Sequence, residues 1–469
     1  MASTTGLLPY KIEVVEDEQA AVTAHAGLPL VLETMRTLGV SAKLDAELGI
    51  RQRNHGATDS EKGEAIVLLL AAGGDCISDI QVLRADKGLE RLLGQEVPSD
   101  EVLRTFLYAF HDDKLIEQAQ RQLRPGEVAY VPAETPALAG LGRVNVSLVH
   151  AVARHMKITC ATLDHDATLQ ESHKKQALPH YKGGRGYQPS VLYWVEADQV
   201  IGDEYRDGNV PAGMENLRLI QHGFSSLPAT VTTYRLRGDS ALYEDAVLKW
   251  LADEERAVGP KGFIGFSISA DMSKQLRAAC VAVPNEHWGL VEERANETVF
   301  GAEVEFTPGD WPKNAKPLRY VAVKFVDKQL DLDGRAHVKC LAVVTNRHDL
   351  SVAELLRWHW EKAGTIEHVH HVVKNELGAA TPPCGRFGAN AAWFRFALLT
   401  YNVLSAMKQL VLPPSMESAQ PKRMRFSLFS LAARITSHAG ATLMKIGLAL
   451  ERLGDLVGSR LRLAQLAVT

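Results

Sequence analysis

The sequence is poor in cysteine and has no apolar run long enough to cross a membrane. Its five cysteines are scattered over 469 residues without a CxxC pair, so neither a disulfide framework nor a cysteine zinc site is expected. The main apolar stretch, AIVLLLAA at 65–72, is too short to span a bilayer. The first residues lack the basic and then apolar segments of a secretion signal. We therefore expect a cytoplasmic protein with no membrane partner.

Positive charge is not in excess over the whole chain. The formal net charge is -4, so any contact with nucleic acid must depend on local patches. Residues 172–187 hold four basic side chains and no acidic one, and residues 420–462 hold eight basic against two acidic. Each patch fits a phosphate-binding surface and equally a solvated loop or helix face. The basic residues are Lys174, Lys175, Lys182 and Arg185, then Lys422, Arg423, Arg425, Arg434, Lys445, Arg452, Arg460 and Arg462.

The amino-terminal part, residues 1–140, is predicted to be a helical DNA-binding region. From 20 to about 124, apolar residues recur at helical spacing. The same spacing would suit any helical bundle, so it does not by itself establish DNA binding. A connector rich in proline and glycine, 125–142, is expected to end this region.

The sequence then alternates between strand and helix patterns. Seven segments follow one another: strands at 157–166, 188–197 and 199–206, a helix at 211–222 capped by Asn209, a strand at 231–237, a helix at 241–258 and a strand at 262–269. The first three strands fit an antiparallel meander, and the others require crossover helices. This is the order of a ribonuclease-H-like core, so the predicted fold class is α/β.

More β-type sequence interrupts this core. We predict a β-rich insertion at 276–345, which divides the core into residues 150–275 and 346–410. The second part of the core holds two long helical patterns, from about 352 to 377 and from 389 to 410. Residues 411–469 are expected to form a basic, helical carboxyl-terminal region.

Acidic residues fall at three places that this fold would bring together. Asp164 and Asp166 share one face of the first strand, because side chains alternate along a strand. Asp239 follows the fourth strand at its carboxyl end, where sites form in α/β sheets. Glu367 lies on the long helix after the insertion. Carboxylates suit Mg²⁺, and two divalent cations about 4 Å apart can promote in-line displacement at a phosphodiester.

Histidines around Glu367 raise the alternative of a zinc site. Glu367 and His371 have the i, i+4 spacing of two ligands on one helix, but the sequence places no third ligand. We interpret His368, His370 and His371 instead as polar or DNA-facing residues of the helix. The glycine-rich segment 182–186 lacks the Gly-Lys-Ser/Thr ending of a phosphate loop, and a flexible turn near DNA explains it better.

Several motifs occur in a fixed order along the chain. They are Asp-x-Asp-Ala-Thr at 164–168, Tyr-Lys-Gly…Gly-Tyr-x-Pro at 181–189, Gly-Asn at 208–209, Arg-x-Asp-Ser at 237–240, and Trp360, Ala363, Glu367 and Lys374 at spacings of three, four and seven. They resemble the motifs of DDE-type insertion-sequence transposases of the insertion-sequence-4 superfamily, most similarly its insertion-sequence-1380 branch. In that family the last signature is tyrosine, arginine, glutamate and lysine, so Ala363 departs from it and Trp360 replaces the tyrosine.

The resemblance implies a role for each motif residue. Asp166 (or Asp164), Asp239 and Glu367 would hold two Mg²⁺ ions, for which Mn²⁺ can substitute. Asp166 is favoured because Ala167 and Thr168 follow it, as in the family; Asp164 would then bond a basic side chain or a metal-bound water. Lys374 and Trp360 would contact DNA. Without an arginine at 363, Arg357 or Lys362 would have to grip the DNA end. The two basic patches would bind further phosphates, through Lys174, Lys175, Lys182, Arg185, Lys422, Arg423 and Arg425.

The implied function is cut-and-paste transposition of the element that encodes the protein. Its partners would be double-stranded DNA with terminal inverted repeats, target DNA and a second copy of the chain, in association with the bacterial nucleoid. Two alternatives remain: a domesticated DNA-binding protein that keeps the fold, and a metal-dependent nuclease without strand transfer. Loss of one of the three acids would favour the first, and none is lost here.

Overall fold

The structure is a computed structural model that describes residues 21–467, except 314, 332, 334, 439, 440, 448 and 449 and the side chains of 450–452. Two features predicted from the sequence therefore lie outside the described residues. They are the first 20 residues of the helical region and the side chain of Arg452 in the basic carboxyl-terminal patch.

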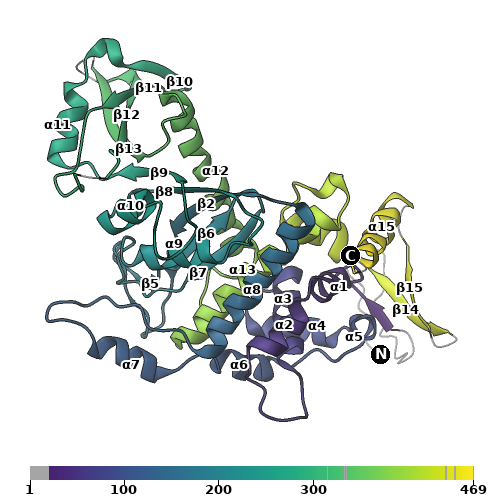
Figure 1. Ribbon diagram of the computed structural model, residues 1–469. Helices are drawn as coiled ribbons and strands as arrows, with labels where there is room; N and C mark the ends of the chain where they lie inside the picture. Colours follow the sequence, from purple (N-terminus) through teal and green to yellow (C-terminus); the bar gives the residue numbers. More distant parts are fainter. Residues whose placement is uncertain are drawn as a thin grey trace.

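A nine-stranded mixed sheet runs through the molecule in the order β10-β11-β12-β13-β9-β8-β2-β6-β7 (Figure 1). The strands are β2 (Cys160–Ala167), β6 (Ser190–Trp194), β7 (Gln199–Glu204), β8 (Thr233–Gly238), β9 (Ile264–Ala270), β10 (Gly289–Glu293), β11 (Glu297–Val304), β12 (Arg319–Leu330) and β13 (Ala336–Thr345). β2, β6 and β7 form an antiparallel meander, and β8 and β9 continue parallel to β2. The predicted α/β class, the meander and the parallel strands are confirmed.

Helices cover both faces of this sheet. The α-helices of the described chain are α1 (Pro29–Thr37), α2 (Val40–Glu47), α3 (Asp59–Ala72), α4 (Ile80–Ala85), α5 (Lys87–Leu93), α6 (Asp100–Tyr108), α7 (Asp113–Arg121), α8 (Pro136–Met156), α9 (Asn216–Ser225), α10 (Asp245–Ala252), α11 (Lys274–Ala282), α12 (Val352–Glu376), α13 (Phe387–Leu410), α14 (Pro421–Met424) and α15 (Leu450–Leu466). Alternate residues of β6 face opposite ways: Val191 and Tyr193 join the core around α13, whereas Leu192 and Trp194 join the core around α9 and α10.

Two helices of the core differ from their predicted bounds. α9 begins later than 211, and Asn209 does not cap it, because the Asn209 side chain donates to the carbonyl of Val128 at 2.7 Å. α10 ends at Ala252 rather than at 258. The buried Arg256 donates to the backbone carbonyls of residues 250, 251, 260 and 262, and this holds the chain in a turn where a longer helix was expected.

The β-rich insertion extends the central sheet. Its last strand, β13, pairs antiparallel with β9, with Ala342 opposite Ala270. The strands β10 to β13, together with α11, form the lobe at the upper left of Figure 1, and α12 leads from this lobe back to the centre. Within the insertion the sequence predicted strands at 303–306, 320–326 and 337–345. The last two correspond to β12 and β13, the first overlaps β11 only at its last two residues, and β10 and α11 were missed.

The long helices α12 and α13 lie where they were predicted. α12 starts with a capping box, in which Ser351 accepts from the N–H of Glu354 and the Glu354 carboxylate accepts from the N–H of Ser351. α13 is buried on all sides and packs against α3, α6 and α8. The amino-terminal helices thus share one apolar core with α12 and α13.

The predicted connector at 125–142 is partly wrong, because α8 already begins at Pro136. Thr135 caps this helix by accepting from the N–H of Leu138 at 3.2 Å, and proline suits the first helical position. Gly140 allows a close approach, since a Cβ there would lie 2.2 Å from the carbonyl oxygen of Glu47. Glycine therefore serves helix packing here and does not mark a loop.

The carboxyl-terminal region was predicted to be helical, but the structure shows that it also contains strands. A hairpin of β14 (Ala433–His438) and β15 (Ala441–Ile446) lies at the right of Figure 1, where β14 pairs with β1 (Ala21–Thr23) and packs against α5. Ala433 and Ile435 are buried and Arg434 between them is exposed, which is the alternation of a strand.

None of the described helices is by itself long and apolar enough to cross a bilayer. The pair Asp59–Ala72 and Ile77–Ala85 has the length and composition of a span but is bent by 93°. The first of these two segments, α3, is largely buried in the core.

Candidate active site

The carboxyl ends of β2 and β8 place two aspartates beside each other. In this parallel pair Asp164 lies opposite Arg237, so Asp166 and Asp239 follow two residues further along each strand. Neighbouring strands are about 4.8 Å apart, and alternation gives both aspartates the same face of the sheet. The backbone fixes the second carboxylate, because Asp239 Oδ1 accepts from the N–H of Ala241 at 3.0 Å.

The two carboxylates repel each other. Burial raises the pKa of Asp166 and of Asp239 above the ordinary value. The Lys362 ammonium, 3.5 Å from Asp166 Oδ1, offsets part of the rise in each pKa. The charge of Asp166 adds to the rise in the pKa of Asp239. A divalent cation between them would relieve this repulsion, so the pair suits a metal site.

The first aspartate of the motif, Asp164, is bonded to side chains of β8 and α12. It is fully buried, and its carboxylate accepts two hydrogen bonds from Arg237, at 2.7 and 3.0 Å, and one from the hydroxyl of Thr365. Arg237 also donates to the carbonyl of Trp358 and to the Glu361 carboxylate, each at 2.7 Å. The guanidinium therefore ties β2 and β8 to α12. The expected bond from Asp164 to a basic side chain is present.

One histidine of α12, His370, turns towards Asp166. His370 is only 9% exposed, and its Nε2 lies 3.6 Å from Asp166 Oδ2. Burial lowers the pKa of His370 to about 3, and Lys362 and Lys374 add to this fall, so the ring is neutral at pH 7. His371 is exposed and contacts Asn375 at 3.0 Å. Of the two alternatives given for these histidines, burial favours a polar residue of the helix over a DNA-facing one for His370.

Glu367 is exposed on α12, one turn before His370. Within the described part of the chain, Glu367 does not form a closed group of three candidate ligands with Asp166 and Asp239. The structure therefore brings the two aspartates together on adjacent strands, and it leaves the glutamate on the helix that crosses their ends.

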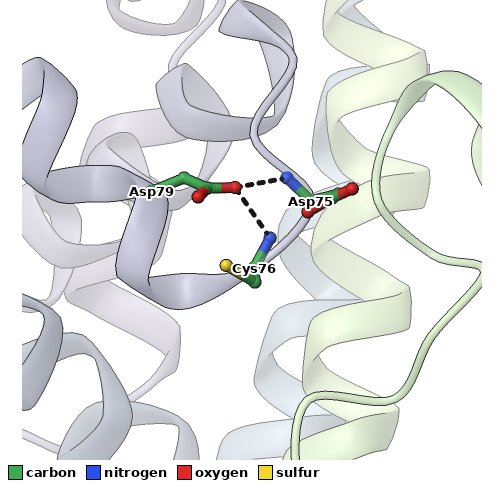
Figure 2. A group of neighbouring side chains, drawn as sticks. All are labelled: Asp75, Cys76 and Asp79. Carbon is green, nitrogen blue, oxygen red and sulfur yellow. Dashed lines mark hydrogen bonds between the residues drawn. The ribbon is translucent and has the colours of Figure 1, made fainter.

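One group of three candidate ligand atoms does lie within 4.8 Å in the described chain, formed by Asp75, Cys76 and Asp79. Asp79 Oδ2 accepts hydrogen bonds from the backbone N–H groups of Asp75 and Cys76, at 3.0 and 3.2 Å (Figure 2). This is the bonding of a capped turn at the start of a short helix. The group is explained locally and lies among the amino-terminal helices, away from β2 and β8.

Trp360, which was predicted to contact DNA, lies against the lobe formed by β10 to β13. Its ring is half-buried against the insertion, 4.8 Å from the Arg294 guanidinium and 6.3 Å from the Phe325 ring, measured to the ring centroids. The indole therefore joins α12 to the lobe formed by β10 to β13.

Two of the predicted phosphate-binding residues are also engaged inside the protein. The Lys374 ammonium donates to the carbonyl of Leu169 at 2.7 Å, and burial lowers its pKa. Arg425 donates to the carbonyl of Glu376 at 3.0 Å, so it caps the last turn of α12. By contrast, Lys422 and Arg423 are exposed.

The basic segment 172–187 forms a small sheet next to the end of β2. Its strands are β3 (Gln170–Glu171), β4 (Leu178–Pro179) and β5 (Arg185–Tyr187), in the order β3-β5-β4. Lys174, Lys175 and Lys182 are exposed, whereas Arg185, also exposed, donates to the carbonyl of Ala177 at 2.7 Å.

An exposed aromatic ring accompanies these basic side chains. Tyr181 is 74% exposed, with the Lys182 ammonium 5.6 Å from its ring centroid. Exposed aromatic rings among basic residues are typical of surfaces on which nucleic-acid bases stack. In the sequence Tyr181 stood out only as part of a motif, and it was not predicted as a site residue.

His370 and Lys362 were likewise missed as parts of the acidic site. The sequence held a signal for His370, because Glu367 and His370 are three residues apart and so share one face of a helix. The i, i+4 spacing of Glu367 and His371 instead suggested a zinc-binding pair. Lys362 was predicted only as a possible grip on the DNA end, because its proximity to Asp166 depends on how α12 crosses the sheet.

Comparison with known proteins indicates the family of the chain. No curated protein matches the chain. The sequence from residue 10 to residue 452 matches the family described as "Transposase DDE domain group 1". Because this match spans nearly the whole chain, the protein belongs to that family of DDE transposases.

Proposed function

We propose that the protein cuts the ends of the DNA element that encodes it and joins them to target DNA, with divalent metal ions, on a ribonuclease-H-like core. The observation that carries this proposal is the pair Asp166 and Asp239 at the carboxyl ends of two neighbouring parallel strands. The strand order of β7, β6, β2, β8 and β9 supports the ribonuclease-H-like assignment. Membership of the insertion-sequence-4 superfamily and its insertion-sequence-1380 branch is part of the same proposal.

The donor set fits Mg²⁺, with Mn²⁺ as a substitute. Asp166 and Asp239 offer hard carboxylate oxygens in a half-buried place, and Glu367 offers a third from α12. Ions bound there would promote attack of water, and then of the freed 3′ hydroxyl, at a phosphodiester. Arg237 sets the position of α12, and therefore of Glu367, through its bonds to Asp164, at 2.7 and 3.0 Å, and to the carbonyl of Trp358, at 2.7 Å.

DNA would lie across the carboxyl end of β2. The small sheet β3-β5-β4 follows β2 directly and presents Lys174, Lys175 and Lys182 to solvent. These ammonium groups can neutralise phosphates of the bound end, and Tyr181 can stack on a displaced base. Lys374 holds the start of this segment through the carbonyl of Leu169, so it acts on the DNA indirectly. A dimer would hold the two element ends together.

A cleavage and joining reaction tests the proposal. The full chain is incubated with Mg²⁺, a supercoiled target plasmid and a DNA fragment that carries the flanks of its gene. We expect cleavage at terminal inverted repeats and covalent joining of the freed ends to the plasmid. Fragments without joined products would instead identify a plain nuclease. DNA binding without any cleavage would identify a domesticated binding protein, and either result would overturn the proposal.

The two aspartates of the first motif give a sharper version of this test. Asp166→Ala should abolish both cleavage and joining, because it removes a metal ligand. Asp164→Ala should keep measurable activity, lowered ~10–100-fold, because Asp164 acts through Arg237 and Thr365. If instead Asp164→Ala is inactive and Asp166→Ala is not, after both are shown to be folded, the assignment of the ligand is wrong.

A further inference from the structure

The imidazole of His370 is directed at the metal-binding pair. His370 comes from the buried face of α12, and its Nε2 lies 3.6 Å from Asp166 Oδ2. The other oxygen of this carboxylate, Oδ1, faces the Lys362 ammonium at 3.5 Å. Each oxygen of Asp166 thus has a different neighbour, the Lys362 ammonium at Oδ1 and the His370 imidazole at Oδ2.

His370 Nε2 is a buried polar atom without a hydrogen-bond partner in the described structure. Such atoms are rare in folded proteins, because each costs free energy unless something binds it. The distance of 3.6 Å is too long for a hydrogen bond to Asp166. It is close to the separation of about 3.0–3.4 Å between two ligand atoms that share one cation with bonds of about 2.1 Å.

We propose that His370 Nε2 is a ligand of the same divalent cation as Asp166 Oδ2. The ligand set of this ion then mixes carboxylate oxygen with one imidazole nitrogen, which goes beyond the three carboxylates of the proposed function and rests on it. Glu367 and His370, three residues apart on α12, present an oxygen and a nitrogen on one helix face. Asp239 completes the site from β8, and Lys362 leaves Asp166 Oδ2 free for the ion.

A nitrogen ligand changes which metal the site prefers. Carboxylates alone suit Mg²⁺, whereas imidazole favours transition metals over Mg²⁺. The wild-type protein should therefore prefer Mn²⁺ to Mg²⁺ more strongly than a variant with oxygen at this position. His370→Asp supplies that oxygen, and it should bring the ratio of the two affinities closer to one.

Electron paramagnetic resonance of bound Mn²⁺ tests the ligand directly. The full-length protein is loaded with less than one equivalent of Mn²⁺, and modulation of the electron spin echo by ¹⁴N is recorded. We expect one imidazole nitrogen in the wild type, lost in His370→Gln and retained in the matched control His371→Gln. We also expect His370→Gln to bind Mn²⁺ at least ~10-fold more weakly. Asp239→Asn checks that the ion is at this site, since it should weaken Mn²⁺ binding too.

A measurement on the wild type does not depend on how His370→Gln folds. Labelling with ¹⁵N-histidine should replace the ¹⁴N pattern by that of ¹⁵N, and His368→Gln and His371→Gln should leave it unchanged. Mn²⁺ that binds with Asp239-dependent affinity but without nitrogen modulation would overturn the role of His370 and leave the proposed function intact. Modulation that persists in folded His370→Gln would do the same. Absence of any Mn²⁺ binding by the wild type would overturn both proposals.

Discussion

Arg237→Met removes the side chain that joins β2 and β8 to α12. Arg237 is fully buried and donates four hydrogen bonds, two to Asp164, one to Glu361 and one to the carbonyl of Trp358. Methionine fills part of the space without a charge. After the substitution, the buried carboxylate of Asp164 keeps the hydrogen bond from the hydroxyl of Thr365 but loses both bonds from Arg237.

The cost of this change follows from burial. Removing one partner of a buried ion pair typically costs ~3–5 kcal/mol, because the other charge stays buried and unpaired. The pair with Glu361 adds little, since that side chain is 63% exposed and surface pairs contribute about 0–1 kcal/mol. Asp164 therefore dominates the expected loss, and Glu361→Gln serves as the matched control with a loss below ~1 kcal/mol.

Equilibrium unfolding in urea measures the loss of free energy of unfolding. Arg237→Met should be destabilised by ~3–5 kcal/mol relative to wild type. The double variant Asp164→Leu with Arg237→Met should regain most of this loss, because no unpaired charge remains. A loss below ~1 kcal/mol for Arg237→Met, or a double variant no more stable than the single one, would refute the reasoning.

Three further predictions concern charge and stacking near the site. Lys362→Gln removes the ammonium 3.5 Å from Asp166 and should tighten Mn²⁺ binding at least ~10-fold, as measured by calorimetry. Unchanged affinity would mean that the charge of Lys362 does not repel the bound ion. Replacing the exposed Lys422 and Arg423 by alanine should reduce the salt dependence of DNA binding, measured by anisotropy, by about 0.9 for each phosphate that is no longer neutralised. An unchanged slope would place both away from DNA. Tyr181→Ala should weaken binding to DNA ends by ~1–3 kcal/mol, whereas Tyr181→Phe should not, and equal affinities for both would exclude stacking.

The order of elements in the core could be predicted from sequence because each carries its own local pattern. β2, β6, β7, β8 and β9 and the two long helices all have apolar residues at the spacing of their own structure. The carboxyl-terminal hairpin was missed because it is completed by β1 from the other end of the chain. α8 was missed because its glycines suggested a loop, whereas Gly140 allows contact with Glu47.

The candidate site was predictable where the strand register decides it. Alternation along β2 predicted that Asp164 and Asp166 share one face, and the end of β8 pointed to Asp239; the choice of Asp166 over Asp164 came from the family resemblance. The tertiary contacts of α12 could not be predicted in the same way. Only the crossing of this helix over the sheet determines that Trp360 packs on the insertion, that His370 faces Asp166 and that Glu367 stays exposed.

Asp239→Asn tests the central claim most directly. An amide at this position can still accept from the N–H of Ala241, so the turn after β8 is kept while one ligand charge is lost. We predict that cleavage of end DNA in Mg²⁺ falls by several orders of magnitude, while affinity for the DNA end stays within ~3-fold of wild type. Full cleavage by Asp239→Asn would contradict the assignment of Asp166 and Asp239 as the metal-binding pair.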